Sequence, residues 1–226
     1  GGFIAGKTES AELGVHALGR TLNPHDSLRN PGTSSSGSAV AVATGMVPIA
    51  LATQTAASIV RPASFCGVYG CKPSFGVIPR TGVLKTTDSL DTVGFFTTHL
   101  EDLERAFDVL RVQGPNYPIA HAAFTDTVRQ SKPSNRSWRV ALVRTHTWDQ
   151  ANQFAQRSIL DWAKQLSEVE DIEVVEVELP YEMEQAHKTH ATVYERSLAN
   201  YFEEEFKKSE LVSPIMHEMI QRGLTI

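Results

Sequence analysis

The spacing of apolar residues predicts the secondary structure of the second half of the chain. Residues 100–110 carry leucines and a phenylalanine at helical spacing, and Thr98 with Glu101 forms a capping-box pattern before them. Residues 151–166 form a second helical pattern. Its expected buried face comprises Ala155, Ile159, Trp162, Ala163 and Leu166.

Two apolar segments flank this second helix and are typical of strands. Residues 138–143 and 172–179 predict the strands, and the order strand, helix, strand implies a parallel βαβ unit. Residues 182–208 and 214–222 predict helices. The pattern therefore indicates the α/β class.

The first half of the chain is less periodic and carries smaller side chains. Residues 38–44 predict a short helix ended by Gly45, and residues 47–52 predict a buried strand. A polar break follows at 54–58, and residues 77–83 predict a strand around Pro79.

Charge separates the same two halves. The chain has 21 basic and 26 acidic residues, a net charge of −5, which favours neither nucleic acid nor an anionic membrane as a partner. Residues 1–97 hold only five acidic and seven basic side chains. We expect this charge-poor, glycine-rich part to be buried and to carry the chemistry.

Several other functions are disfavoured. The longest apolar stretch, 39–52, is shorter than the about 20 residues that span a bilayer, and the first residues do not form a secretory signal, so we expect a cytoplasmic protein. Cys66 and Cys71 lack zinc-ligand spacing and are expected to be reduced thiols. His187 and His190 are three residues apart on an expected helix without a third ligand, so we predict no metal and no cofactor.

A nucleotide-binding alternative rests on the first eight residues, GGFIAGKT. They match the P-loop pattern at Gly1, Gly6, Lys7 and Thr8. A P-loop needs a strand before its first glycine and a helix directly after its threonine. Residues 3–5 instead look like a strand through the loop itself, which disfavours this alternative.

The strongest chemical feature is the serine-rich loop at 33–38 together with Ser58. Each hydroxyl has an ordinary explanation, because Ser34, Ser35 or Ser36 can cap the following helix and Ser58 can be a loop residue. The amino-acid sequence around these serines is more specific. The chain reads NPGTSSSGSAVAVATGMVPIALATQTAASIVRPASFCGVYGCKPSFGVIPRTGV and then SLDTVGFF.

This stretch resembles the signature of the amidase signature family of amide hydrolases. The likeness runs from GKTESAELG to the helix at 100–110, and TQTxxSxxRPAxFCG is similar to the malonamidase-like members, whose substrates carry a carboxylate beside the amide. The resemblance implies a mixed sheet flanked by helices, incomplete at the N-terminus and the C-terminus. It implies a signature core at 1–114, a linker at 115–137, and a continuation of the same α/β domain at 138–226.

The resemblance also assigns catalytic roles. Ser58 falls on the nucleophile and Ser34 on the bridging serine of a Ser-Ser-Lys triad, whose lysine lies upstream of GKT and is absent from this chain. A serine hydroxyl needs such a base to take its proton. A lysine can act as that base only when neutral, which burial in a charge-poor region favours.

Two further groups of residues follow from the same resemblance. The oxyanion hole falls on the backbone of Thr55, Ala56 and Ala57, where alanines replace the family's usual glycines; a positive φ at either alanine would strain the loop. Arg61 is assigned to clamp a substrate carboxylate, with an internal ion pair to Asp88 or Asp91 as its alternative, and Ser35 is assigned to substrate binding.

These observations predict hydrolysis of a small linear carboxamide, one that can carry a carboxylate, through an acyl-enzyme. The expected partner is the amide itself, and a homodimer is the assembly to test. One alternative keeps the fold but makes the protein an ammonia-generating amidotransferase-type subunit. The other, from a different class, is the P-loop nucleotide binder.

Overall fold

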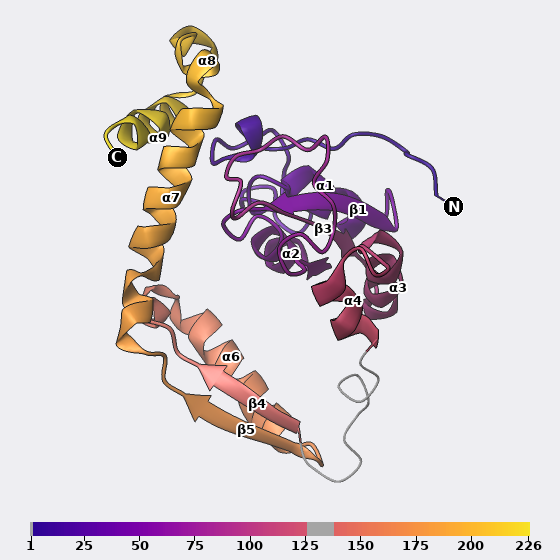
Figure 1. The fold of residues 1–226 in the computed structure, drawn as a ribbon. Coiled ribbons are helices and arrows are strands. Elements are labelled where there is room, and N and C mark those ends of the chain that lie inside the picture. Colours follow the sequence, from indigo (N-terminus) through magenta and orange to yellow (C-terminus); the bar gives the residue numbers. More distant parts are fainter. Residues whose placement is uncertain (1, 126–137) are drawn as a thin grey trace. The chain divides into compact units, whose positions relative to one another are not determined.

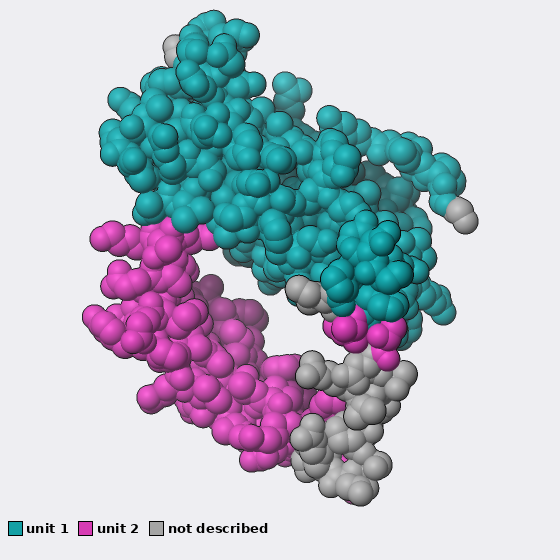
Figure 2. All heavy atoms as spheres, viewed as in Figure 1, with its two compact units in different colours: residues 1–121, 191–226 teal, residues 122–190 magenta. Residues whose placement is uncertain are grey.

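The computed structural model describes residues 2–125 and 138–226, and these residues form two compact units (Figure 2). The first unit contains residues 1–121 and 191–226, and the second contains residues 122–190. The C-terminal part that follows residue 138 thus contributes to both units. No helix among the described residues is long and apolar enough to span a membrane.

A three-stranded antiparallel sheet lies at the centre of the first unit (Figure 1). Its strands are β1 (Ile49–Gln54), β2 (Tyr69–Cys71) and β3 (Thr92–Thr97), in the order β1-β3-β2. Every residue of the middle strand β3 is buried. Gly94 of β3 stands opposite Ala52, and a side chain at Gly94 would come within 2.0 Å of the Cys71 carbonyl oxygen.

Helices cover both faces of this sheet. Successive side chains of a strand point to opposite faces, so neighbouring residues of β3 pack against different helices. Phe96 packs with small residues of α1 (Ser36–Ala43) and α2 (Val60–Cys66). Phe95 packs with the apolar face of α3 (Leu100–Leu110). The serine-rich loop therefore lies at the start of a helix that is fixed on the sheet.

The C-terminal helices belong to the first unit from residue 191 onward. Among them, α7 (Ala186–Tyr201), α8 (Glu203–Phe206) and α9 (Pro214–Leu224) follow one another, with short 3-10 helices at Ser209–Leu211 and Glu12–Gly14 nearby in the same unit. A separate core joins Val15 to Leu198, Met216 and Ile220. The N-terminal segment is thereby packed against helices about 200 residues away in sequence.

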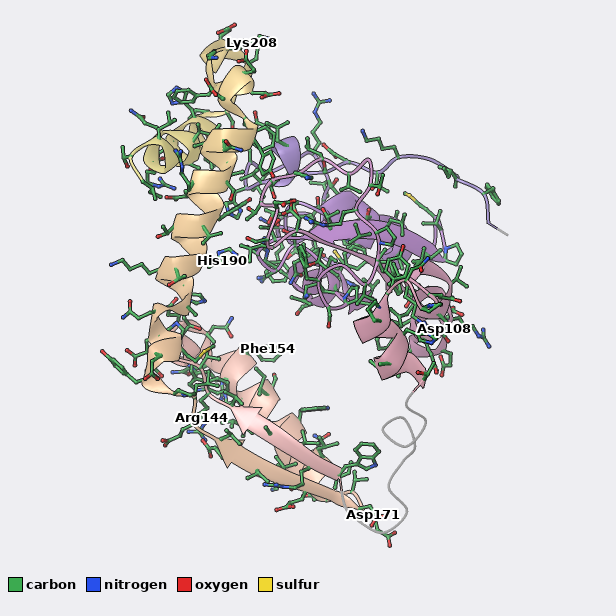
Figure 3. All side chains as sticks on the ribbon, viewed as in Figure 1. Asp108, Arg144, Phe154, Asp171, His190 and Lys208 are labelled. Atoms are coloured by element: carbon green, nitrogen blue, oxygen red, sulfur yellow. The ribbon has the colours of Figure 1, made fainter. Side chains whose placement is uncertain are left out.

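The second unit confirms the parallel βαβ prediction. Strands β4 (Trp138–Val143) and β5 (Ile172–Val177) pair in parallel, with α6 (Gln153–Ser167) between them in sequence. Arg144, labelled in Figure 3, pairs with Glu176 at 3.1 Å. The remaining elements are α4 (Pro118–Thr125), which begins in the first unit, and 3-10 helices at Trp148–Gln150 and Tyr181–Gln185.

Helix α4 lies within the expected linker at 115–137, of which residues 126–137 lie outside the described residues. Three details of the expected structure are wrong. Residues 77–83 form turns rather than a strand. His99, not Thr98, is the N-cap of α3, and no side chain caps it. Of the expected apolar face of α6 only Ala163 is buried, because a two-stranded sheet is too narrow to cover a helix of 15 residues.

Candidate active site

A cavity of about 380 Å³ in the first unit brings the two predicted catalytic serines together. Ser34 and Ser58 both line it, as do Ser35 and Thr55. The further lining residues come from three segments: Lys7–Ser10 with Leu13 and Gly14, Ser38 with 51–53, and Arg80, Val83, Leu84, Thr86 and 91–93.

The chain brings these residues together through a helix and a returning strand. Helix α1 leads away from the serine-rich loop, and β1 runs back beside it, so that the end of β1 meets the start of α1. The Ser35 hydroxyl donates to the carbonyl of Thr53 at 3.1 Å, and the Ser38 hydroxyl donates to that of Leu51 at 2.8 Å. This arrangement carries Ser58, 24 residues beyond Ser34, to the same cavity.

The Ser34 hydroxyl is buried and unpaired: its Oγ atom has no hydrogen-bond partner among the described residues. A buried polar atom without a partner costs about 1–3 kcal/mol, so native proteins rarely keep one without a use. Its φ of +25° follows +53° at Thr33, which shows a strained turn; every peptide bond of the described residues is nonetheless trans.

Ser58 lies at a tight turn that leads into α2. Gln54 at the end of β1 accepts hydrogen bonds through Oε1 from the backbone N–H groups of Ile59 (2.9 Å) and Val60 (3.1 Å), which would otherwise be unpaired at the helix start. Directly before Ser58, Ala57 adopts a φ of +64°, whereas Ala56 does not have a positive φ. Of the two alanines that stand where the family usually has glycines, only Ala57 is therefore in a strained conformation.

A buried carboxylate that sequence reasoning did not place in the site supports the expected oxyanion loop. Asp91 accepts hydrogen bonds from the hydroxyl groups of Thr55 and Thr86 and from the backbone N–H groups of Thr86 (2.7 Å) and Thr87 (3.0 Å). Asp91 also lines the cavity. Asp88 and Asp91 both lie in the threonine-containing segment 86–92, so no signal in the sequence singled out Asp91.

Arg61 is placed differently from the substrate clamp that the resemblance implied. Its Nε atom donates to the carbonyl of Gly32 at 2.8 Å, and its Nη2 atom donates to the Thr33 hydroxyl at 2.7 Å. It is not among the residues that line the cavity, and burial lowers the pKa of its guanidinium. Arg61 therefore holds the turn that precedes Ser34.

The alternative ion pair of Arg61 is also not formed among the described residues. Asp88 pairs instead with Arg80 and Lys85, and Asp91 is occupied by the threonines. Arg80 also lines the cavity, and sequence reasoning did not place it there.

The other candidate sites do not assemble. No helix begins at Thr8, whose hydroxyl instead lies 2.7 Å from that of Ser38, so the local structure also disfavours the P-loop alternative. His187 contacts His146 (Nδ1 to Nε2, 3.2 Å), and no group of three metal-ligating side chains occurs among the described residues. Both cysteines are free thiols, and burial raises the pKa of Cys66 to about 11.

The chain is similar to known proteins of one family. Residues 1–225 match the sequence model of the Amidase family. The chain is 36% identical over 159 residues to a glutamyl-tRNA(Gln) amidotransferase subunit of Campylobacter lari, covering 70% of this chain and 34% of the relative. It is 38% identical over 150 residues to the corresponding protein of the same name from Deinococcus radiodurans, covering 64% and 31%.

Solved structures show the same fold. A crystal structure of an amidase matches with a TM-score of 0.76 and 26% identity over 91% of this chain and 43% of that one. The peptide amidase of Stenotrophomonas maltophilia matches with a TM-score of 0.63 and 27% identity over 82% and 39%. The chain thus spans about a third of the length of these curated relatives and less than half of these solved chains. With a family match over nearly its whole length, the chain belongs to the amidase family.

Proposed function

We propose that the protein hydrolyses small linear carboxamides through an acyl-enzyme formed on Ser58. The observation that carries this proposal is the convergence of Ser58 and the unpaired, buried Ser34 hydroxyl on one cavity. Membership of the amidase family supports an amide as the substrate. A cavity of about 380 Å³ has room for a small amide.

The proposed reaction begins with attack of Ser58 Oγ on the amide carbon. The Ser58 proton passes to Ser34, which hands its own proton to a base, and the carbonyl oxygen becomes an oxyanion. When the tetrahedral intermediate collapses, the C–N bond breaks and the departing nitrogen takes up a proton through the same relay. Water then hydrolyses the Ser58 ester, which releases the acid and restores both hydroxyls.

Two features of the site would favour these steps. Backbone N–H groups of the 55–57 turn would stabilise the oxyanion, each donor being worth about 3 kcal/mol in comparable sites. The Asp91 hydrogen bonds hold Thr55, and with it the start of this turn, in place. The base is assigned by resemblance to a lysine outside this sequence; Lys7, which also lines the cavity, is exposed and is not given that role.

Replacement of the serines tests the mechanism. In the purified protein we expect Ser58→Ala to lower kcat for small amides by about 10³-fold or more, and Ser34→Ala by about 10²-fold or more, because each removes a link of the proton relay. Ser64→Ala, an exposed serine on α2, is the matched control and should stay within about twofold. Steady-state kinetics of ammonia release measures these effects.

A covalent probe gives an independent reading. A serine-reactive fluorophosphonate should label the protein without substitutions at Ser58 and should not label the Ser58→Ala variant. Intact mass and peptide mapping detect the label. Full activity in Ser58→Ala, or labelling confined to another serine, would disprove the assignment of the nucleophile.

A second candidate function is favoured by the names of the curated relatives, which are glutamyl-tRNA(Gln) amidotransferase subunits. In that case Ser58 would release ammonia from glutamine for use by a partner protein. Hydrolysis of glutamine that appears only when a partner protein is added would support this version. Hydrolysis of simple amides by the protein alone would support the amidase version.

A further inference from the structure

Arg80 places a guanidinium at the wall of the cavity that holds Ser34 and Ser58. Its side chain is only 19% exposed, and its guanidinium carbon lies 4.5 Å from the centre of the Phe75 ring. Its Nη2 atom donates to Asp88 at 3.3 Å. The aromatic ring and the carboxylate fix the orientation of the planar group.

The other terminal nitrogen of Arg80 has nothing to bind. Nη1 is buried, and no acceptor among the described residues contacts it. Arginine cannot lose its proton in a protein, so these N–H groups remain donors. A buried, charged donor without an acceptor is costly, so an acceptor that reached Nη1 by way of the cavity would remove that cost.

The positive charge of Arg80 is not fully balanced by the nearby carboxylates. Asp88 is shared with Lys85, whose Nζ atom is 3.2 Å from the same carboxylate oxygen, so that two cations use one anion. The two acidic residues that line the cavity are engaged elsewhere. Asp91 accepts four hydrogen bonds from threonines, and Glu9 accepts from the backbone of Arg20 and the hydroxyl of Thr21.

We propose that Arg80 binds the carboxylate of the substrate, and that the preferred substrates are therefore carboxamides of dicarboxylic acids. This inference rests on the proposed function for the position of the amide at Ser58. It replaces Arg61 in the role of carboxylate clamp, because the Nε and Nη2 atoms of Arg61 are used by the turn at Gly32 and Thr33. An arginine and a carboxylate suit one another through charge and planar geometry.

Equilibrium binding to the Ser58→Ala protein tests the proposal without requiring turnover. The probes are succinamate and butyramide, which differ by replacement of a carboxylate with a methyl group, and malonamate with propionamide as a shorter pair. Isothermal titration calorimetry should show tighter binding of the anionic member of at least one pair. Arg80→Met should weaken binding of that anion at least tenfold and change the neutral partner less than twofold.

Two further variants separate recognition from folding of the loop. Arg105→Met removes an exposed arginine that also has an aspartate at 3.3 Å, and it should leave both affinities unchanged. Asp88→Asn removes the ionic partner of Arg80 and should retain or increase the preference for the anion. If Arg80 acted only by holding the loop through Asp88, Asp88→Asn would instead weaken both members of a pair together.

The outcomes are distinct for the two proposals. Equal affinity for the members of both pairs, or an anion preference that persists in Arg80→Met, would overturn the role of Arg80. An anion preference that depends on Arg80 in a protein whose Ser58 is neither labelled nor needed for turnover would retain the binding site and refute the catalytic mechanism.

Discussion

Ala57 has a positive φ, as do Thr33 and Ser34 of the serine-rich loop. Its φ of +64° lies in the left-handed region, which costs a residue with a Cβ atom about 1–2 kcal/mol. Its carbonyl accepts a hydrogen bond from the backbone of Arg61 at 2.9 Å, so the turn is tied into α2. The strained residue directly precedes Ser58.

Glycine at this position should relieve the strain. We expect Ala57→Gly to raise the free energy of unfolding by about 0.5–1 kcal/mol, since relief of the left-handed penalty exceeds the added entropy of the unfolded chain. Ala56→Gly, at a residue without a positive φ, should lower it by about 0.5–1 kcal/mol. Urea denaturation measures both; a shift of the same sign in the two variants would contradict the geometry.

At the scale of elements, the middle strand β3 shows how tightly the sheet is built. A Cβ atom at Gly94 would lie 2.0 Å from the carbonyl oxygen of Cys71 in β2 and 2.7 Å from Ile59 Cδ1. The absence of a side chain therefore sets how closely β2 and the start of α2 approach β3. That approach also fixes the end of the loop that carries Ser58.

Gly94→Ala should accordingly be severe. We expect it to lower the free energy of unfolding by about 3 kcal/mol, because a backbone carbonyl cannot move as a flexible side chain can. Gly6→Ala introduces the same methyl group where nothing lies within 4 Å and φ is not positive, and it should change stability by less than about 0.5 kcal/mol. Thermal and urea unfolding of Gly94→Ala indistinguishable from that of Gly6→Ala would refute this account.

For the molecule as a whole, the first unit depends on packing between distant parts of the sequence. Val15 shares a core with helices α7 and α9, and Glu12 accepts a hydrogen bond from the backbone of Ser213 at 2.9 Å. The segment that follows Val15 leads to the serine-rich loop. Leu13 and Gly14, directly before Val15, line the cavity, so the C-terminal helices support one of its walls.

This dependence predicts an effect at a distance. Leu198→Ala, at a fully buried position of α7, should lower the free energy of unfolding by about 3 kcal/mol and weaken hydrogen-exchange protection at the backbone of Gly14 and Val15. Val193→Ala, on the same helix but 38% exposed, should do neither. Unchanged exchange at Gly14 and Val15 in Leu198→Ala would show that the two parts fold independently.

Elements with a clear local pattern could be predicted from the sequence. The helix at 100–110 and the strand at 138–143 have the expected bounds, because the apolar pattern of each segment is typical of its secondary structure. Strand β3 was missed because burial on both faces removes any alternation. Helix α2 was not predicted, because Pro62 disfavours a helix interior, although a proline in the first turn of a helix loses no hydrogen bond.

The sequence by itself determined the α/β class, the parallel βαβ unit and, through a long resemblance, the family and the candidate serines. Only the tertiary structure decided which side chains share the cavity with those serines. Arg61 and Arg80 are both arginines near the same motif, yet one is bound to a turn while the other faces the cavity. Local pattern cannot separate them, because burial and partner choice depend on contacts between segments far apart in the chain.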